Sequence, residues 1–548
     1  MLKKYILASL FMIPSLAHAA QSSASMVVSA HPLATEAGIQ ILKQGGNAFD
    51  AAAATALALG VVEPGSSGIG GGGFFLLYIA KEKRYVMIDA RETSPTLAGH
   101  GEIYNTQSSI NGAQSAGVPG LLAGVDHLIS RYGRIAREKN ASPAIALASN
   151  GFAIGSHLHG MIKWRKGVLN DAAQVIFLNN GHAPQKGYVL HQKALADTLL
   201  SFAKHGADDF YRGETAGRLV ADMKRDGGLI REKDLANYKI IERKPMQFTY
   251  HNTQFISAAL PSSGGITMAE TFGILQHDNL KKMSAVNRTH LLIEAMKRAY
   301  KDRNQYLGDG DFVRIPDLLN PQRLRKLRDS IDLKKATPSE SLKGFAEPIG
   351  ASVDTTHFSI IDDEGNMVSA TLSINYGMGS GYVSPSTGIL MNDEMDDFAT
   401  RPGRANAYGL IQGKANAIEP HKRMLSSMSP TFVMDKNRTF IVGTPGGSRI
   451  ISMVMLASMY FIMDDRPPKQ WVNTPRFHHQ FLPDVVQYEA EAFSPKMLKE
   501  LQKRGHHLKQ MSRQYGNMQA ILWNRSNGKL TGISDARGEG KAKQIQRH

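Results

Sequence analysis

Residues 354–375 read DTTHFSIIDDEGNMVSATLSIN. Residues 357–362 alternate and are rich in β-branched types, and residues 367–375 are again strand-like. Between these runs, residues 363–366 read DEGN, a composition typical of a turn. The stretch therefore predicts a β-hairpin.

The register of this hairpin brings a few polar residues together. If Asp362 pairs with Met367, Thr355 lies opposite Ile374 to within one residue. Ser373 and Asn375 then lie beside Thr355. We therefore expect a hydroxyl and an amide side chain beside a threonine at the start of a strand.

The chain before this hairpin has a different composition. Residues 336–354 are rich in Thr, Pro, Ser, Glu and Gly without periodicity, which predicts an exposed linker. Residues 120–330 alternate helical patterns with short loops and show no repeat. A chain break after the linker and before the strand would make Thr355 a new N-terminus.

An N-terminal threonine would supply both a nucleophilic hydroxyl and the base that activates it. A hydroxyl is a weak nucleophile near neutral pH and needs a base beside it. The chain has no cysteine and no obvious GxSxG elbow. The α-amino group of an N-terminal threonine, with a pKa of about 7.7–8.0, can accept the proton of its own hydroxyl. Cleavage between Asp354 and Thr355 would create that base.

Composition excludes several classes of protein. The 548 residues are 42% hydrophobic and 20% charged, which is ordinary globular composition and excludes a disordered chain. The absence of cysteine excludes disulfides, cysteine-ligated zinc, iron–sulfur clusters and thiol nucleophiles. The net charge of +16 is compatible with nucleic acid, anionic lipid or acidic substrates. Basic runs at 163–166 and 323–328 are typical of solvated helix faces, so no nucleic-acid partner is expected.

The N-terminus has the pattern of a secretory signal. Two lysines at positions 3 and 4 precede an apolar run over 5–16, and residues 17–19 form a small-x-small cleavage site. The alternative is a buried N-terminal helix. We expect residues 1–19 to be a signal peptide, and the product to be exported to a periplasm or secreted. The apolar run is too short to span a bilayer and no later run is long enough, so no stable membrane insertion is expected.

Helix and strand signals lie on both sides of the predicted linker. Residues 32–44 predict a helix ending at a Gly-Gly pair, and Asn47 predicts the cap of a second helix that reaches Leu59. After the linker, residues 430–442 predict a second hairpin that leads into an apolar helix over 448–462.

A glycine-rich loop at 65–73 contains GxGxxG. In dinucleotide-binding proteins a helix must follow this motif to hold the pyrophosphate. Here the next runs, 74–80 and 85–90, predict a β-hairpin instead. We interpret the loop as backbone that closely approaches another segment.

Several long motifs closely resemble the γ-glutamyltranspeptidases of the N-terminal nucleophile hydrolase superfamily, over nearly the whole mature chain. They are residues 45–52, 63–74, 89–92, 355–359, 392–398, 425–430, 446–449 and 475–479.

The resemblance implies an α+β fold, a four-layer αββα sandwich made as one self-cleaving precursor. Residues 20–354 would form a large subunit and residues 355–548 a small catalytic one, joined as a heterodimer in a single core. Thr355 would attack the Asp354 carbonyl during processing and the substrate's γ-amide afterwards. Water or an amino acid or dipeptide acceptor would resolve the γ-glutamyl enzyme. Glutathione and other γ-glutamyl compounds would be substrates, with no cofactor and no metal.

The resemblance also assigns site residues. Ser373, commonly Thr in the family, would lie beside the nucleophile. Arg91, Ser426 and Ser427 would bind the carboxylate of the substrate. Asn375, Glu394 and Asp397 would bind its ammonium group. A fork of donors and a fork of acceptors suit these two charges. Gly446 and Gly447 would supply the oxyanion hole, and they precede a predicted helix whose dipole favours negative charge. Tyr408 resembles the tyrosine of a lid loop.

Other interpretations stay open. The alternatives are a surface residue for Arg91, a helix cap or turn for Ser426–Ser427, a solvated pair for Asp396–Asp397, and a structural rather than metal-binding role for His478–His479. A glutaryl (β-lactam side-chain) acylase of the same fold is the nearest rival activity, although a site with unpaired carboxylates disfavours a substrate without an amine. An unprocessed binding protein and a surface protein that binds anions are further alternatives.

Overall fold

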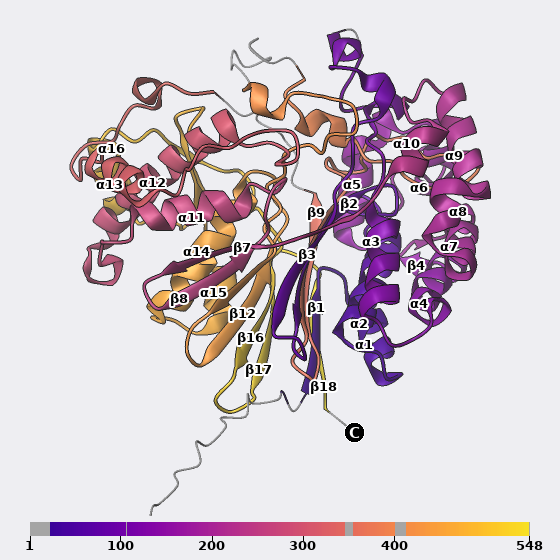
Figure 1. Ribbon diagram of the computed structural model, residues 1–548, viewed down its shortest axis with the longest axis horizontal. Coiled ribbons are helices and arrows are strands. Elements are labelled where there is room, and N and C mark those ends of the chain that lie inside the picture. The colour runs from indigo at the N-terminus through magenta and orange to yellow at the C-terminus, as the bar shows by residue number, and fades with distance from the viewer. Residues whose placement is uncertain (1–21, 23, 106, 346–353, 401–412, 547–548) are drawn as a thin grey trace, which may run out of the picture.

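A computed structural model describes residues 22, 24–105, 107–345, 354–400 and 413–546. Two antiparallel sheets face each other, and a layer of helices covers the outer side of each sheet (Figure 1). This arrangement is the αββα sandwich that the resemblance implies.

The first sheet has seven strands in the part of the chain that the structure describes, each antiparallel to its neighbours. In spatial order they are β18 (Lys541–Gln546), β1 (Ala24–Ser29), β9 (Thr355–Ile361), β10 (Met367–Ser373), β2 (Gly72–Ile79), β3 (Arg84–Ala90) and β6 (Ile241–Arg243).

The second sheet, again counted over the described residues, has six strands. In order they are β17 (Leu530–Ser534), β16 (Gln519–Asn524), β12 (Arg438–Gly443), β11 (Thr431–Met434), β8 (Thr253–Ser257) and β7 (Met246–Tyr250). Each sheet thus combines strands from before and after position 354.

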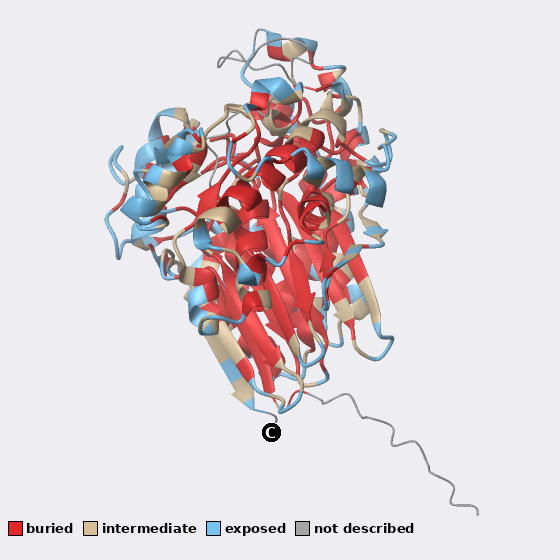
Figure 2. Ribbon diagram, turned by 90° about the vertical axis from the view of Figure 1, so that its left-hand side faces the viewer, coloured by how far each residue is buried: buried red, intermediate tan, exposed pale blue. Residues whose placement is uncertain are grey.

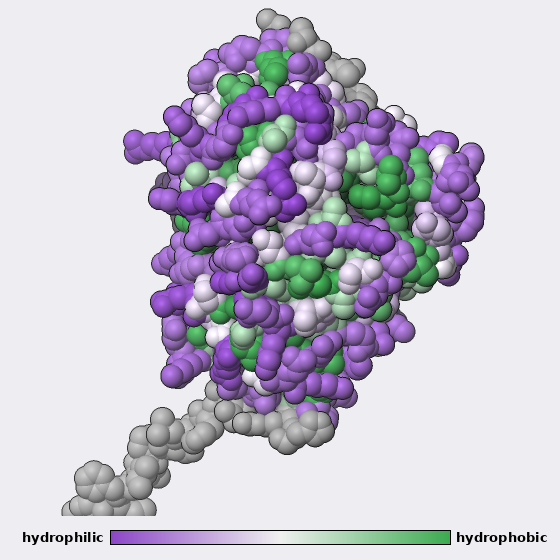
Figure 3. Space-filling view, turned by 90° about the vertical axis from the view of Figure 1, so that its right-hand side faces the viewer, coloured by the Kyte–Doolittle hydropathy of each residue, from purple (hydrophilic) through white to green (hydrophobic). Residues whose placement is uncertain are grey.

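Helices from the first half of the chain cover the first sheet (Figure 1). They are α1 (Pro32–Lys43), α2 (Ala48–Val62), α3 (Leu121–His127), α4 (Arg137–Asn150), α5 (Ser156–Arg165), α6 (Asp171–Phe177), α7 (Lys193–His205), α8 (Ala207–Arg212), α9 (Glu214–Arg225) and α10 (Glu232–Asn237). Figure 3 views this side of the molecule: hydrophilic side chains cover most of the face, with hydrophobic side chains between them.

The helices beside the second sheet come from both sides of position 354. They are α11 (Gly264–Ile274), α12 (Ala285–Tyr306), α13 (Pro321–Asp329), α14 (Arg449–Met463), α15 (Pro468–Asn473) and α16 (Pro495–Lys503). Short strands complete the fold: β4 (Phe152–Ala153), β5 (Val189–Leu190), β13 (Phe477–His478), β14 (Val486–Tyr488) and β15 (Leu508–Gln510). No helix among the described residues is both long and apolar enough to cross a membrane.

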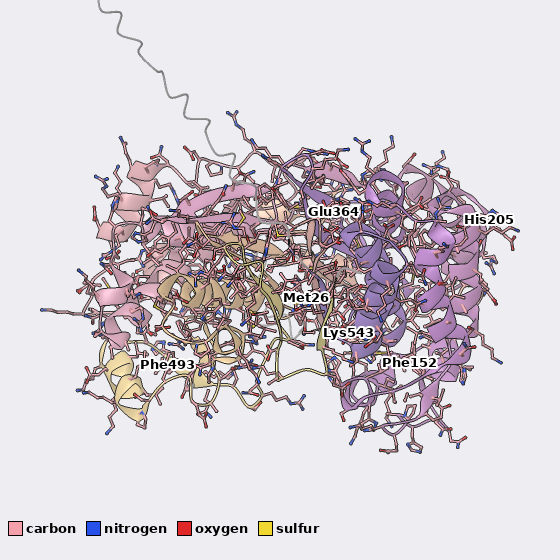
Figure 4. The ribbon with its side chains drawn as sticks, turned by 90° about the horizontal axis from the view of Figure 1, so that it is seen from below. Met26, Phe152, His205, Glu364, Phe493 and Lys543 are labelled. Carbon is pink, nitrogen blue, oxygen red and sulfur yellow. The ribbon has the colours of Figure 1, made fainter. Side chains whose placement is uncertain are left out.

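The central strands are buried on both faces (Figure 2). In β2, Phe75 and Leu77 pack into the cluster under the α1–α10 layer, whereas Phe74 and Leu76 pack into the cluster shared with the second sheet. This alternation is the period of two of a β-strand, with apolar residues on both faces. Seen from below, Met26 lies centrally between the helical layers that carry Phe493 and His205 (Figure 4).

Most of the predicted elements are confirmed. Asn47 forms a capping box with Asp50 at the start of α2, which continues three residues beyond the predicted end. The hairpins β2–β3, β9–β10 and β11–β12 and the helix α14 form where the sequence predicts them.

One expectation is wrong, and another, the exposed linker, differs from the structure at its start. Residues 120–330 also contain β6, β7 and β8, and the last two complete the second sheet. The start of the predicted exposed linker is anchored: the Ala336 N–H donates to Arg504 O at 2.6 Å, and the N–H of the fully buried Ser339 donates to Asp484 Oδ2 at 2.8 Å. Residues 346–353 of the linker lie outside the described residues.

The glycine loop approaches other backbone closely, and strand β2 follows it. A Cβ on Gly71 would lie 2.2 Å from Ser373 O, and one on Gly73, whose φ is +150°, would lie 2.3 Å from Thr371 O. These glycines let β2 enter the sheet against β10. They have no side chain because β10 occupies that space.

Gly71→Ala should lower the stability of the protein by about 1–3 kcal/mol or more, because its methyl group has no room beside Ser373. Gly217→Ala is the matched control: nothing lies within 4 Å of its added Cβ in helix α9, so a gain of about 0.5–1 kcal/mol is expected. Thermal unfolding of both variants measures the difference. Equal melting temperatures would contradict the packing described for the loop.

Candidate active site

A pocket opens where the hairpin β9–β10 meets the start of α14 and the segment before β11. Its lining combines residues from both sides of position 354. They are Arg91, Arg303, Asn304, Leu307, Thr355, Ser373, Asn375, Tyr376, Asp396, Asp397, Phe398, Ala399, Gly413, Asn416, Leu425, Ser426, Ser427, Met428, Gly447, Ser448 and Ile450.

Thr355 and Ser373 face each other in this pocket. Their hydroxyl oxygens lie 3.2 Å apart, and the two residues are paired directly in the β9–β10 ladder. The register differs by one residue from the predicted one, because Ile361 rather than Asp362 pairs with Met367. The prediction that Ser373 lies beside Thr355 is therefore confirmed.

Thr355 lies within the continuous chain, next to Asp354, so its nitrogen is a peptide amide. Thr355 and Asp354 are both only 8% exposed. The peptide bond between them is therefore almost completely enclosed.

Arg91 is the centre of a buried acidic cluster. Its Nη1 lies 2.7 Å from Glu394 Oε2 and 3.4 Å from Glu92 Oε2, and its Nη2 donates to Asp397. The contact with Glu394 is an ion pair without hydrogen-bond geometry: among the described residues, neither Glu394 oxygen nor Arg91 Nε has a hydrogen-bond partner. The cluster therefore contains donor and acceptor atoms that are not yet satisfied.

Burial disfavours the ionised form of the acids in this cluster. Burial raises the pKa of Glu92 to about 7 and raises the pKa of Glu394 well above its usual range, and Arg91 opposes both shifts. Three carboxyl groups surround one guanidinium, so an additional positive charge nearby would stabilise the ionised acids. Asp396 lies apart from this cluster: Ser109 Oγ donates to it at 2.5 Å, and burial raises its pKa to about 6.

Asn375 is the second residue after the end of β10. Its φ of +73° is in the left-handed region, its N–H donates to Ser373 Oγ at 2.8 Å, and its side-chain amide donates to Asp393 O at 3.1 Å. The backbone of Asn375 thus holds the Ser373 hydroxyl in position.

Ser426 and Ser427 also line the pocket. The Met428 N–H donates to Ser426 Oγ at 3.1 Å, and Arg303 Nη2 donates to Ser427 Oγ at 2.8 Å. Both hydroxyl oxygens therefore act as acceptors here.

Arg303 is a pocket residue that the sequence analysis misses. It is on α12, and its Nε also donates to Ser263 Oγ at 2.8 Å. No motif marks it, because only the tertiary fold brings α12 to the serine pair. Glu92 is likewise absent from the predicted site, although it belongs to the motif at 89–92.

Gly446 and Gly447 lie directly before α14, with φ values of +142° and +58°. Gly447 and Ser448 line the pocket, whereas Gly446 is not among its lining residues. Tyr408 lies outside the described residues.

The histidines that the sequence analysis considered lie outside the pocket lining. His357 Nδ1 lies 2.8 Å from Thr371 Oγ1, His478 Nδ1 lies 2.8 Å from Ser452 Oγ, and His479 Nε2 lies 3.0 Å from Asp484 Oδ1. Within the described ranges, no cluster of three or more potential ligands has the geometry of a metal site.

A family profile described as gamma-glutamyltranspeptidase matches residues 34–545. The chain is 38% identical over 534 residues to a glutathione hydrolase proenzyme of Escherichia coli (strain K12), a match that covers 95% of this chain and 91% of the relative.

Solved structures share the fold. A cephalosporin acylase from Bacillus halodurans has a TM-score of 0.85 at 27% identity, over 100% of both chains. A gamma-glutamyltranspeptidase from Helicobacter pylori has a TM-score of 0.56 at 36% identity, over 58% of this chain and 94% of that one.

The buried His357 predicts a measurable dependence of stability on pH. Burial lowers its pKa to about 3, so the folded protein keeps the ring neutral. The unfolded chain, with a histidine pKa of about 6.5, takes up a proton as the pH falls below that value, so His357 costs stability progressively from pH 6.5 down to 3. At pH 5 the loss is roughly 2 kcal/mol.

Melting temperatures of the wild type and of His357→Gln at pH 7 and pH 5 test this expectation. The variant should be less stable at pH 7, because it loses buried contacts, but its melting temperature should fall less on acidification. An equal fall in both proteins would show that His357 does not titrate as described.

Proposed function

The chain belongs to the gamma-glutamyltranspeptidase family, and we propose that Thr355 is the nucleophile of both its self-cleavage and its catalysis. As a member of this family, the chain is a γ-glutamyltransferase and hydrolase. The observation that carries the assignment is the pair of facing hydroxyls, Thr355 and Ser373, in a pocket that Arg91 and the serine pair also line.

Self-cleavage is the first proposed step. Thr355 Oγ1 attacks the carbonyl carbon of Asp354, the C–N bond breaks, and the hydroxyl proton ends on the departing nitrogen. Water then hydrolyses the ester, which leaves a carboxylate on Asp354 and a free α-amino group on Thr355. Residues 20–354 and 355–548 become two chains of one heterodimer. Their association is supported by the two sheets, since each contains strands from both chains.

The same oxygen then acts on the substrate. The α-amino group of Thr355 accepts the hydroxyl proton, and Oγ1 attacks the γ-amide of a γ-glutamyl compound such as glutathione. The amine leaves, and water or an amino acid or dipeptide acceptor releases the γ-glutamyl group. Ser373 orients the attacking oxygen through the 3.2 Å contact.

We assign the two charged ends of the glutamyl group to two adjoining sets of residues, since Arg91 contacts both Glu394, which is not among the pocket-lining residues, and Asp397, which is. Arg91 and the hydroxyls of Ser426 and Ser427 offer donors for the α-carboxylate. Asn375 and the acids Glu394 and Asp397 offer acceptors for the ammonium. The three carboxyl groups around Arg91 support this division, because a bound ammonium would favour the ionised form of acids whose pKa burial raises.

We assign the tetrahedral oxyanion to the backbone N–H groups of Gly446 and Gly447. The position of Gly447 in the pocket wall, just before α14, supports this role, because a helix N-terminus favours negative charge. The lid role of Tyr408 is a proposal that rests on the family resemblance alone.

A glutaryl acylase is the second candidate, and the likeness to a cephalosporin acylase favours it. A glutaryl group has no ammonium. It would leave Glu394 and Asp397 without a substrate ammonium to bind. We therefore rank this activity below γ-glutamyl transfer.

We also propose that the enzyme is exported and acts in a periplasm or outside the cell. The signal pattern of residues 1–19, which lie outside the described residues, supports this location.

Thr355→Ala should abolish both processing and activity, because it removes the only oxygen assigned to both attacks. The intact mass of the denatured, purified protein should show two chains that meet between Asp354 and Thr355 in the wild type and one uncut chain in the variant. A processed or active variant would contradict the proposal.

Selectivity for the ammonium gives a separate prediction. The wild type should hydrolyse γ-glutamyl p-nitroanilide with a kcat/KM about a hundredfold or more above that for glutaryl p-nitroanilide, and Asp397→Asn should reduce this ratio about tenfold or more. Asp435→Asn, which alters a carboxylate in the distant β11–β12 turn, is the control and should leave the ratio unchanged. A preference for the glutaryl substrate would support the acylase instead.

A further inference from the structure

Glu63 lies next to the nucleophile, yet it is not part of the pocket. The hydroxyl of Thr356, the residue after Thr355, donates to Glu63 Oε2 at 2.7 Å. Successive side chains of a strand point to opposite faces, so Thr356 points away from the face to which Thr355 contributes its hydroxyl. Glu63 therefore holds the start of β9 from the side opposite the pocket.

The backbone of Glu63 is firmly held. Glu63 is the C-cap residue of α2, its N–H donates to Leu59 O at 2.8 Å, and its carbonyl accepts from the N–H groups of Ser66 and Ser67 at 2.9 and 3.1 Å. The same turn contacts the chain after β10, where the Met378 N–H donates to Gly65 O at 3.0 Å. A rigid turn of the predicted large subunit thus braces both strands that carry the facing hydroxyls.

We propose that Glu63 is a positioning residue for self-cleavage: through Thr356 it fixes the backbone of Thr355 so that Oγ1 is aligned with the Asp354 carbonyl. This inference rests on the proposed role of Thr355. Attack on the preceding carbonyl requires a defined rotation of the Thr355 backbone, and misalignment of reacting atoms by about 1 Å can cost a hundredfold in rate. The Glu63–Thr356 hydrogen bond acts on the residue immediately after the attacking one.

The surroundings of Glu63 do not favour a carboxylate for stability alone. Burial raises its pKa, and the nearby carboxyl groups of Glu539 and Asp354 raise it further, while His157 opposes the shift. His157 Nε2 lies 3.9 Å from Asp354 Oδ1. A buried acid is costly, and well-packed apolar side chains are often at least as stable in such places. The alignment of Thr355 therefore explains an acid at position 63 better than a contribution to stability does.

The test follows the cleavage rate of the freshly purified full-length precursor. Thr356→Val removes the donor while keeping the branched shape, Glu63→Leu removes the acceptor, and Glu63→Gln keeps a carbonyl oxygen that can accept from Thr356. The first two variants should cleave about tenfold or more slowly than the wild type. Glu63→Gln should restore the rate to within about threefold, since its amide oxygen replaces the carboxylate as acceptor.

A matched control separates alignment from general stability. Thr371→Val also removes one buried hydroxyl from the same sheet, where Thr371 contacts His357, and should lower the melting temperature as Thr356→Val does while cleaving at the wild-type rate. The double variant Glu63→Leu/Thr356→Val should cleave no more slowly than the slower single variant, because both changes break the same hydrogen bond.

Two results would overturn the inference: wild-type cleavage rates in Thr356→Val and Glu63→Leu, or equal slowing in Thr371→Val. Thr355→Ala, measured in parallel, distinguishes this failure from that of the proposed function. If Thr355→Ala stays uncut while the Glu63 and Thr356 variants cleave normally, only the positioning role fails. If Thr355→Ala is cleaved, the nucleophile assignment itself fails.

Discussion

The pairing of β9 with β10, in the register that sets Thr355 opposite Ser373, is the constraint on which the rest of the structure depends. A slip of one residue in such a pair turns every side chain to the other face of the sheet. It would direct the Thr355 hydroxyl toward α2 and bring Thr356 to the pocket. The register is secured from the far side of β10 as well, because Gly71 and Gly73 admit β2 at a distance that no side chain would allow.

Around this register the pocket collects charged and polar groups from distant parts of the chain. Arg91 follows β3, Arg303 comes from α12, and Gly447 precedes α14. Holding three carboxyl groups near one buried guanidinium costs desolvation energy, which a bound ammonium offsets in part. Each sheet also combines strands from before and after position 354, so a chain cut before Thr355 would keep its two parts joined in one core.

Local signals in the sequence were sufficient for much of the fold. The capping box of α2 and the alternation of β9 and β10 depend on residues close together in the sequence, so the sequence alone is enough to predict them. The edge strand β7 was missed because two of its five residues are exposed and only pairing with β8 defines it. At the site, motifs led to Arg91, Glu394 and Asp397, whereas Arg303 was missed because its contact with Ser427 joins residues more than a hundred positions apart.

The central claim, that Thr355 Oγ1 forms the covalent bond to the substrate, is tested most directly by trapping that bond. The processed enzyme would be mixed with γ-glutamyl p-nitroanilide without an acceptor, quenched rapidly in acid, digested and mapped by tandem mass spectrometry. The account predicts a γ-glutamyl group on the side chain of Thr355, the first residue of the small chain. A γ-glutamyl group on Ser373 or on any other residue would contradict it.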